Sequence, residues 1–536
     1  MRLLCLLASA LLMGATEPTK PNIVFVLIDD MGWGDFSCFG NTEAKTPNID
    51  RLAAEGLRFE QFYVNSPICS PSRCAFVTGQ YPQRWRINSF LESRAANEAK
   101  GNAQWLEPRA PSLARTLQAG GYATGHFGKW HLGGQRDVVD APAITAYGYD
   151  ASLTNFEGMG PKLLPLTRKP GDKEPKKIWA DAERLGGPVT WMNRTEITSG
   201  YVDAALKFID TAAAKQQPFY VDLWPDDVHS PYFPPLEKWS PEKHRIYLAV
   251  LEEMDRQLGR LFERVRTDPA LRANTVFVIC SDNGPEPGAG SAGPFRGSKT
   301  QIFEGGLRSS LIVWAPGRMA KERIGGADAA SVFAAMDLAP SLTRLAGLPA
   351  PAGLDGVDLS ATLLGVTAPV PPRSLCWRRP PDRKTWAPAL ATPQPDLAIR
   401  DGDWKLLCEY DGSKPLLYDL KRDPGESRDL AATEPTTVER LTQAVLAWHR
   451  AMPPDNGAAL GAASADELAD VVALAADVDH RVAELVGPGA AGDLEREAGL
   501  GVDDADGVEL VGGFDVRDVG SEVSCAGFAL SVATSI

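Results

Sequence analysis

Four oxygen-bearing side chains follow two strand-like segments at the points where those segments end. The runs Asn22–Ile28 and Thr275–Ile279 are typical of buried strands, and the polar residues just after them are Asp29, Asp30, Asp282 and Asn283. An acidic pair after a strand can also be a helix cap or a solvated turn. Because ligands of open α/β sheets bind at the carboxyl ends of the strands, we expect these side chains to converge. Their hard oxygens favour calcium or magnesium over a transition metal.

A cysteine lies at the start of a predicted helix in the segment Cys69–Arg73, which reads CSPSR. Pro71 suits the first turn of a helix, so Cys69 is expected at the helix N-terminus, where unpaired amides favour negative charge. The alternative is a structural cysteine buried beside a capped helix. Cys69 is therefore a candidate catalytic residue, and the motifs around it must decide between a catalytic and a structural cysteine.

Strand-like and helix-like segments alternate from Pro21 to about Pro349, which predicts an α/β fold around a mostly parallel sheet. Thr46 and Pro47 are expected to open a helix that closes near Gly56, with Thr46 as its N-cap. Further helices are expected over residues 111–118, 201–214 and 244–265, and a strand over residues 219–223. The candidate polar residues repeatedly fall just past strand ends, where such folds bind ligands.

The C-terminal part of the chain has a different organisation. Proline is dense around residues 350–383, which suggests a linker. Beyond it, a hairpin-like pattern over 397–407, a strand-like run over 416–420 and a helix-like run over 437–449 predict a small α+β subdomain. We therefore expect a catalytic domain over 20–372, a small C-terminal subdomain over 373–455 and an acidic tail over 456–536 with few aromatic residues.

The N-terminus has the build of a secretory signal peptide. Arg2 precedes an apolar run from Leu3 to Met13, and Gly14-Ala15 precede the first polar residues. The run is too short to span a bilayer, and no other segment has the length and apolarity of a membrane helix. We expect a signal peptide over residues 1–15, no transmembrane segment, and a secreted or periplasmic protein.

Charge and cysteine usage exclude several classes of protein. The net charge is −14, and residues 456–536 contribute −13 of it, from 16 acidic residues against 3 arginines. Neither part has the basic patch that nucleic-acid binding needs, so no nucleic-acid partner is expected. The seven cysteines beyond the predicted signal peptide are scattered, which does not suggest a disulfide scaffold.

The chain resembles the sulfatase family over roughly residues 20–450. CSPSR at Cys69–Arg73, continued as CAFVTG, matches the signature in which Cys-x-Pro-Ser-Arg directs oxidation of the cysteine to formylglycine. Gly121–Gly133, ending in GKWHLG, is similar to a second signature, with Phe127 larger than expected. Other matching motifs are Asp29-Asp30, SDNG at 281–284, GSK at 297–299, EGG at 304–306 and LYDL at 417–420. The most similar members are arylsulfatases and N-acetylgalactosamine-6-sulfatases.

The resemblance implies a fold and a mechanism. The fold would be an alkaline-phosphatase-like α/β sandwich, with a small C-terminal subdomain. Residue 69, converted by a formylglycine-generating enzyme, would attack sulfur through one hydroxyl of a geminal diol and release sulfate through the other. One divalent cation, calcium rather than magnesium, would be held by Asp29, Asp30, residue 69, Asp282 and Asn283. His131 would assist elimination, His229 and Lys299 would hold sulfate and protonate the leaving oxygen, and Lys129 and Arg73 would support residue 69.

The expected activity is hydrolysis of sulfate esters, with a sulfated carbohydrate or an aryl sulfate as substrate. One alternative is a phosphonate monoester or phosphodiester hydrolase, because relatives on this fold use a similar metal site. Another is a non-catalytic binder of sulfated glycans, whose usual mark, loss of the nucleophile or the metal ligands, is absent here. The segments expected to line the substrate pocket, 85–105 and 147–191, identify no particular sugar.

Overall fold

The computed structural model describes residues 20–366, 370, 373–383 and 394–456. All of these residues lie in one compact unit, Met1–Gly461. The expected signal peptide lies outside the described residues, as does all of the expected tail except Asn456. No helix in the described part of the chain is both long and apolar enough to cross a membrane.

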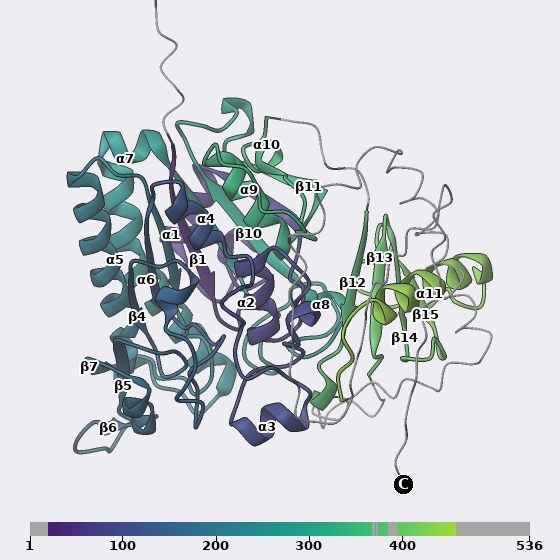
Figure 1. Cartoon of the computed structure of the whole chain (residues 1–536), viewed down its shortest axis with the longest axis horizontal. Coiled ribbons are helices and arrows are strands. Elements are labelled where there is room, and N and C mark those ends of the chain that lie inside the picture. The colour runs from purple at the N-terminus through teal and green to yellow at the C-terminus, as the bar shows by residue number, and fades with distance from the viewer. Residues whose placement is uncertain (1–19, 367–369, 371–372, 384–393, 457–536) are drawn as a thin grey trace, which may run out of the picture. The chain divides into compact units, whose positions relative to one another are not determined.

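An eleven-stranded sheet forms the centre of this unit (Figure 1). Its strand order is β11-β2-β10-β9-β1-β8-β3-β4-β5-β6, and β7 pairs with β5. The bounds are β1 Asn22–Ile28, β2 Leu57–Tyr63, β3 Ala123–Gly128, β4 Ala151–Thr154, β5 Lys162–Thr167, β6 Lys176–Lys177, β7 Val189–Asn193, β8 Phe219–Trp224, β9 Thr275–Ser281, β10 Arg308–Trp314 and β11 Gly326–Ala334. Among the described strands of this sheet, only the pairs of β10 with β2 and β9, and of β5 with β6, are antiparallel, so the sheet is mostly parallel, as predicted.

Strand β1 shows why the sheet is central. All seven of its residues are buried, and alternate side chains enter two different hydrophobic cores. One core packs under α2 (Cys69–Thr78), α4 (Leu113–Ala119) and α9 (Leu338–Leu345), and the other under α1 (Pro47–Ala54), α5 (Ile197–Ala214) and α6 (Lys243–Thr267). Because side chains of a strand alternate between faces, a continuous apolar run is what a strand covered by helices on both sides requires.

Four short helices also belong to this unit, namely α3 (Arg94–Ala99), α7 (Pro269–Asn274), α8 (Glu304–Leu307) and α10 (Ser360–Leu363). The expected helix starting at Thr46 and Pro47 is present, but the Thr46 hydroxyl does not cap it. Thr46 Oγ1 instead donates to Asp50 Oδ1 at 3.1 Å, inside the first turn.

A separate four-stranded antiparallel sheet follows, in the order β12-β13-β14-β15. Its strands are β12 Ser374–Arg378, β13 Leu397–Asp401, β14 Trp404–Cys408 and β15 Leu416–Asp419, and α11 (Pro435–Arg450) packs on it through Leu441 and Val445. The expected linker over 350–383 is wrong as a description of this stretch. It contains α10, whose Leu363 joins the core of the large sheet, and β12, which is an edge strand of the small sheet.

A buried ionic network joins the small sheet to the large one. Lys405 Nζ of β14 lies 3.0 Å from Glu304 Oε1 at the start of α8 and 3.0 Å from Glu426 Oε1. Glu304 Oε2 accepts a 2.6 Å hydrogen bond from Tyr63 of β2, and Arg400 of β13 also donates to the Tyr63 hydroxyl. Because buried charges must be paired, this network fixes where the two sheets meet.

Candidate active site

The predicted metal ligands meet at the carboxyl ends of two neighbouring parallel strands. Strands β1 and β9 pair in register up to Ile28 and Ser281, so Asp29 and Asp282 follow at the same level. One carboxylate oxygen from each of Asp29, Asp30 and Asp282 lies within 4.8 Å of the others, and all three residues are fully buried. Asn283 joins them, since its Nδ2 donates to Asp30 Oδ1 at 2.8 Å.

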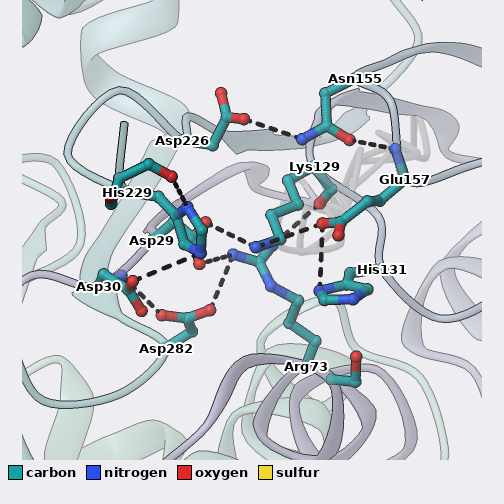
Figure 2. A network of polar contacts seen from close by, with 12 residues as sticks. Asp29, Asp30, Arg73, Lys129, His131, Asn155, Glu157, Asp226, His229 and Asp282 are labelled. Carbon is teal, nitrogen blue, oxygen red and sulfur yellow. Dashed lines mark hydrogen bonds and ion pairs between the residues drawn. The ribbon is translucent and has the colours of Figure 1, made fainter. Parts of the chain in front are cut away.

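Three predicted basic residues surround these carboxylates, and Figure 2 shows two of them, Arg73 and Lys129. Arg73 Nη2 lies 3.0 Å from Asp29 Oδ1 and 2.8 Å from Asp282 Oδ2. Lys129 Nζ lies 2.8 Å from Asp29 Oδ2. Lys299 Nζ lies 2.6 Å from Asp30 Oδ2. Side chains from helix α2, from the end of β3 and from the loop after β9 therefore converge on one buried acidic cluster.

The charges of the cluster are not evenly compensated. Burial opposes ionisation of Asp29, but Lys129, His229 and Arg73 hold its pKa well below the usual value. Burial and the neighbouring charge of Asp29 raise the pKa of Asp282 well above the usual value, and Arg73 offsets only part of this. Three buried carboxylates so close together stay ionised only if more positive charge is near them, which a divalent cation would provide.

The ligand set fits such a cation. The Oδ1 atom of Asn283 is buried and accepts no hydrogen bond from any described residue. A buried amide oxygen without a partner is costly, so this oxygen, on a residue whose Nδ2 contacts the acidic cluster, is available to a cation. Three carboxylates and one amide form an all-oxygen set of the kind calcium and magnesium take. Among the described residues, the cluster whose ligand atoms lie within 4.8 Å of one another holds the three aspartates and does not include Cys69, so the role of residue 69 as a ligand stays a prediction.

Cys69 is the first residue of helix α2, as its sequence predicts, and is 3% exposed. The residue before it, Ile68, has no side chain able to cap the helix, so the positive end of α2 is open toward residue 69. Burial raises the pKa of the Cys69 thiol, while Lys129 and Lys299 lower it. Cys69 is thus close enough to Lys129, Lys299 and the two aspartates after β1 to feel their charges, and burial disfavours its thiolate.

The two predicted histidines lie at different sides of the cluster. His229 Nε2 lies 3.4 Å from Lys299 Nζ and 3.5 Å from Asp30 Oδ2, and its Nδ1 is 2.7 Å from the Ser230 carbonyl. Burial and Lys129 lower the pKa of His229. His131 instead faces Glu157, with its Nδ1 3.2 Å from Glu157 Oε2 and its Nε2 2.9 Å from the Leu91 carbonyl. Both of its ring nitrogens therefore face acceptor oxygens.

Sequence reasoning missed Glu157, a buried carboxylate beside two predicted site residues. Glu157 Oε2 lies 3.4 Å from Lys129 Nζ as well as 3.2 Å from His131 Nδ1, and the residue is 6% exposed. It follows the short strand β4, which pairs in parallel with β3. The rule that located Asp29 and Asp282 at strand ends could have found it, but a strand of four residues gives no clear apolar run.

Comparisons with known proteins agree with this fold and site. Residues 21–348 match the sulfatase family. N-acetylgalactosamine-6-sulfatase of Canis lupus familiaris is 32% identical over 382 residues, covering 68% of this chain and 70% of that protein. Arylsulfatase A of Homo sapiens is 30% identical over 474 residues, covering 81% and 89%. The family match spans the predicted site residues from Asp29 to Lys299.

Solved structures share the architecture. The crystal structure of the sulfatase PsFucS1 from Pseudoalteromonas sp. superposes with a TM-score of 0.61 at 23% identity, covering 81% of this chain and 90% of that one. The crystal structure of Ps i-CgsB superposes with a TM-score of 0.66 at 24% identity, covering 80% and 93%. The fold is thus that of the sulfatases, a large mixed sheet between helices with a small antiparallel sheet after it. The chain belongs to the sulfatase family, and its activity is that of a sulfuric ester hydrolase.

Proposed function

We propose that this sulfatase hydrolyses sulfate esters on carbohydrates, with residue 69 as formylglycine and with one calcium ion as cofactor. The observation that carries the proposal is the placement of Cys69 at the open N-terminus of α2, close to Lys129, Lys299 and three buried aspartates. A thiol there is poorly ionised and has no route to release a covalent sulfate. Formylglycine supplies the two hydroxyls that such a displacement and release require.

The proposed cation is held by Asp29, Asp30, Asp282, Asn283 and residue 69. When bound, it would neutralise the acidic cluster and make hydroxyl groups beside it more acidic. The unpartnered Oδ1 of Asn283 and the raised pKa of Asp282 support this ligand set. Calcium is preferred over magnesium because it accepts irregular all-oxygen sites built from separate segments, whereas magnesium demands a near-ideal octahedron.

The basic side chains of the site would bind the charged sulfate group and transfer protons. A sulfate ester is an anion, so Lys299 and His229, which lie 3.4 Å apart, would hold its oxygens. Lys299 is positioned by Asp30, and the charge of Asp30 helps to raise the pKa of its ammonium, which keeps Lys299 charged. His229 would hold the proton that the leaving alcohol takes up. Arg73 and Lys129 would stabilise negative charge at residue 69, and His131 would accept a proton as sulfate departs.

Carbohydrate is the proposed substrate class because the N-acetylgalactosamine-6-sulfatases that resemble this chain are named for a sulfated sugar. Maturation would require a formylglycine-generating enzyme, and the signal peptide expected over residues 1–15 would direct the protein to a secreted or periplasmic location. Both follow from the sequence signatures at Cys69–Arg73 and Arg2–Ala15.

The test is a screen of the purified protein against defined sulfated mono- and disaccharides, p-nitrophenyl sulfate, and matched phosphate and phosphonate aryl esters. Release of sulfate from a sugar, at a kcat/KM well above that for the phosphate esters, is the expected result. Faster hydrolysis of phosphonate or phosphodiester substrates would replace the proposal with the alternative hydrolase. Tight binding of sulfated sugar without sulfate release, in protein that carries formylglycine and calcium, would identify a non-catalytic binder.

A further inference from the structure

The geometry around Glu157 points to a role that the proposed mechanism does not yet include. Nδ1 of His131 and Oε2 of Glu157 are both buried, lie 3.2 Å apart, and have no well-aligned hydrogen bond to any described residue. The other ring nitrogen, Nε2, is 2.9 Å from the Leu91 carbonyl. Each nitrogen of His131 therefore faces an acceptor oxygen.

Such an arrangement satisfies only one form of the imidazole ring. Neutral histidine has one N–H group, so one of its nitrogens would present a lone pair to an oxygen. The protonated ring has two N–H groups and would satisfy both Glu157 and Leu91. The pocket is thus complementary to the state that His131 reaches after it takes up a proton during turnover.

The backbone and side chain of Glu157 are held by a chain of buried polar contacts (Figure 2). Asn155 Oδ1 accepts from the Glu157 amide at 2.8 Å, and Asn155 Nδ2 donates to Asp226 Oδ2 at 2.9 Å. Arg194 pairs with Asp226 at 2.7 Å. The Glu157 carbonyl in turn accepts from the His131 amide at 2.8 Å. Glu157 is therefore fixed against the His131 segment at two points.

We propose that Glu157 is a positioning residue for His131 and Lys129, and that with the Leu91 carbonyl it stabilises the protonated imidazole formed in the proposed sulfatase reaction. The inference rests on the proposed function for the identity of the proton step. The contact between Glu157 and His131 does not depend on the proposed function, and it can be tested in protein without substrate.

The charges around His131 show why a carboxylate is needed there. The pKa of His131 is lowered to about 4: burial is the largest cause and Lys129 and Arg73 also lower it, whereas Glu157 and the Leu91 carbonyl offset part of this. Glu157 itself is kept ionised despite burial by His131, Lys129, His229 and Arg136, which lower its pKa. Without Glu157, His131 would face two cations and no anion, and would hold a proton poorly.

The test compares Glu157→Gln with Glu183→Gln, a matched change at a half-exposed carboxylate on the neighbouring segment. Steady-state kinetics on a sulfate ester that the wild type hydrolyses should show kcat of Glu157→Gln reduced about 10- to 100-fold with KM changed less than about twofold. Selective ¹⁵N-histidine labelling, with His131 assigned from His131→Asn, gives the second measurement. As pH falls toward 4, the wild-type His131 signal should begin to shift toward imidazolium values, and that of Glu157→Gln should not.

Glu157→Asp, which keeps the charge on a shorter side chain, is expected to recover part of kcat. Equal kcat and equal His131 titration in Glu157→Gln and wild type would overturn the proposal. So would a loss of kcat with unchanged titration, because that is the result of a purely structural role. If Glu157→Gln does not fold, Asn155→Ala should lower kcat at near-constant KM, and a wild-type kcat there would also overturn it. A wild type without sulfatase activity refutes the proposed function, while the titration still tests the contact.

Discussion

Nη2 of Arg73 lies 2.8 Å from Oδ2 of Asp282, and both side chains are fully buried. The contact connects the helix that begins with Cys69 to the strand end that carries two of the proposed metal ligands. Arg73 therefore does more than support residue 69, because it also sets how much of the Asp282 charge is available to a cation. Any change at Asp282 should affect both the cation and the helix.

We expect Asp282→Ala to lower calcium content and to reduce kcat by at least about tenfold, since it removes a proposed ligand at a strand end. Calcium per chain, measured by inductively coupled plasma mass spectrometry after gel filtration, tests the first part. Asp181→Asn, a change at an exposed carboxylate, is the control and should leave both values unchanged. Full calcium occupancy in Asp282→Ala would show that the ligand assignment is wrong.

Residue 69 should be an aldehyde in active protein. Mass spectrometry of the peptide that spans Cys69 should find formylglycine that reacts with a hydrazide probe, whereas Cys74, five positions along the same helix, should be alkylated as a thiol after denaturation. Activity should follow the fraction of residue 69 that is converted, and Cys69→Ala should abolish turnover without loss of the fold. Full activity in protein with an unmodified Cys69 would exclude the proposed chemistry.

The tail beyond the described residues should be dispensable, but the point of truncation matters. Arg378 is 1% exposed, lies 3.5 Å from the Asp455 carboxylate and donates to the Pro453 carbonyl. A chain that ends after Gly461 should unfold cooperatively and keep its activity. The same chain with Asp455→Ala loses the carboxylate that faces Arg378, and its free energy of unfolding should fall by about 3–5 kcal/mol. Chemical denaturation of both chains measures the difference, and equal loss of cooperativity in both would show that the tail belongs to the core.

Stability should fall as pH rises through the range set by Glu426. Burial and the nearby charge of Glu304 raise the pKa of Glu426 to about 7, although Lys405 opposes this. A carboxyl with a raised pKa binds its proton more tightly when folded, so its contribution is complete below about pH 4.5 and is lost as pH rises to about 7. Glu426→Gln should flatten the decrease in Tm over that interval. An unchanged slope would mean that Glu426 is ionised throughout.

Much of the site could be predicted because its residues follow long, fully apolar strands. Strands β1 and β9 are seven residues long and buried on both faces, so their ends are visible in the sequence and locate Asp29 and Asp282. Pro71 marks the start of α2 in the same way. Glu157 could not be found because its position depends on β4 pairing with β3, and four half-buried residues carry no distinct period.

The linker prediction failed for a related reason. Proline between residues 350 and 383 suggested irregular chain, yet Ser374–Arg378 is an edge strand whose only sheet partner is β13, about twenty residues later. An edge strand tolerates nearby proline, since it leaves one row of backbone groups unpaired. Composition alone cannot distinguish such a strand from a linker when its partner lies beyond a further irregular segment.

The ionic network around Glu304 also gives the small sheet an influence on catalysis at a distance. The loop that carries Lys299 leaves the ligand strand after Asn283 and ends at Glu304, whose carboxylate is held by Lys405 and whose amide donates to Glu426 at 2.6 Å. One end of this loop is thus anchored at the cation site and the other on a different sheet. Neither Lys405 nor Glu426 contacts a proposed substrate group. Variants at these two positions should nevertheless have a lower kcat, and not only a lower free energy of unfolding. A search for improved variants that leaves out the C-terminal sheet would overlook its connection to Lys299, the proposed sulfate-binding lysine.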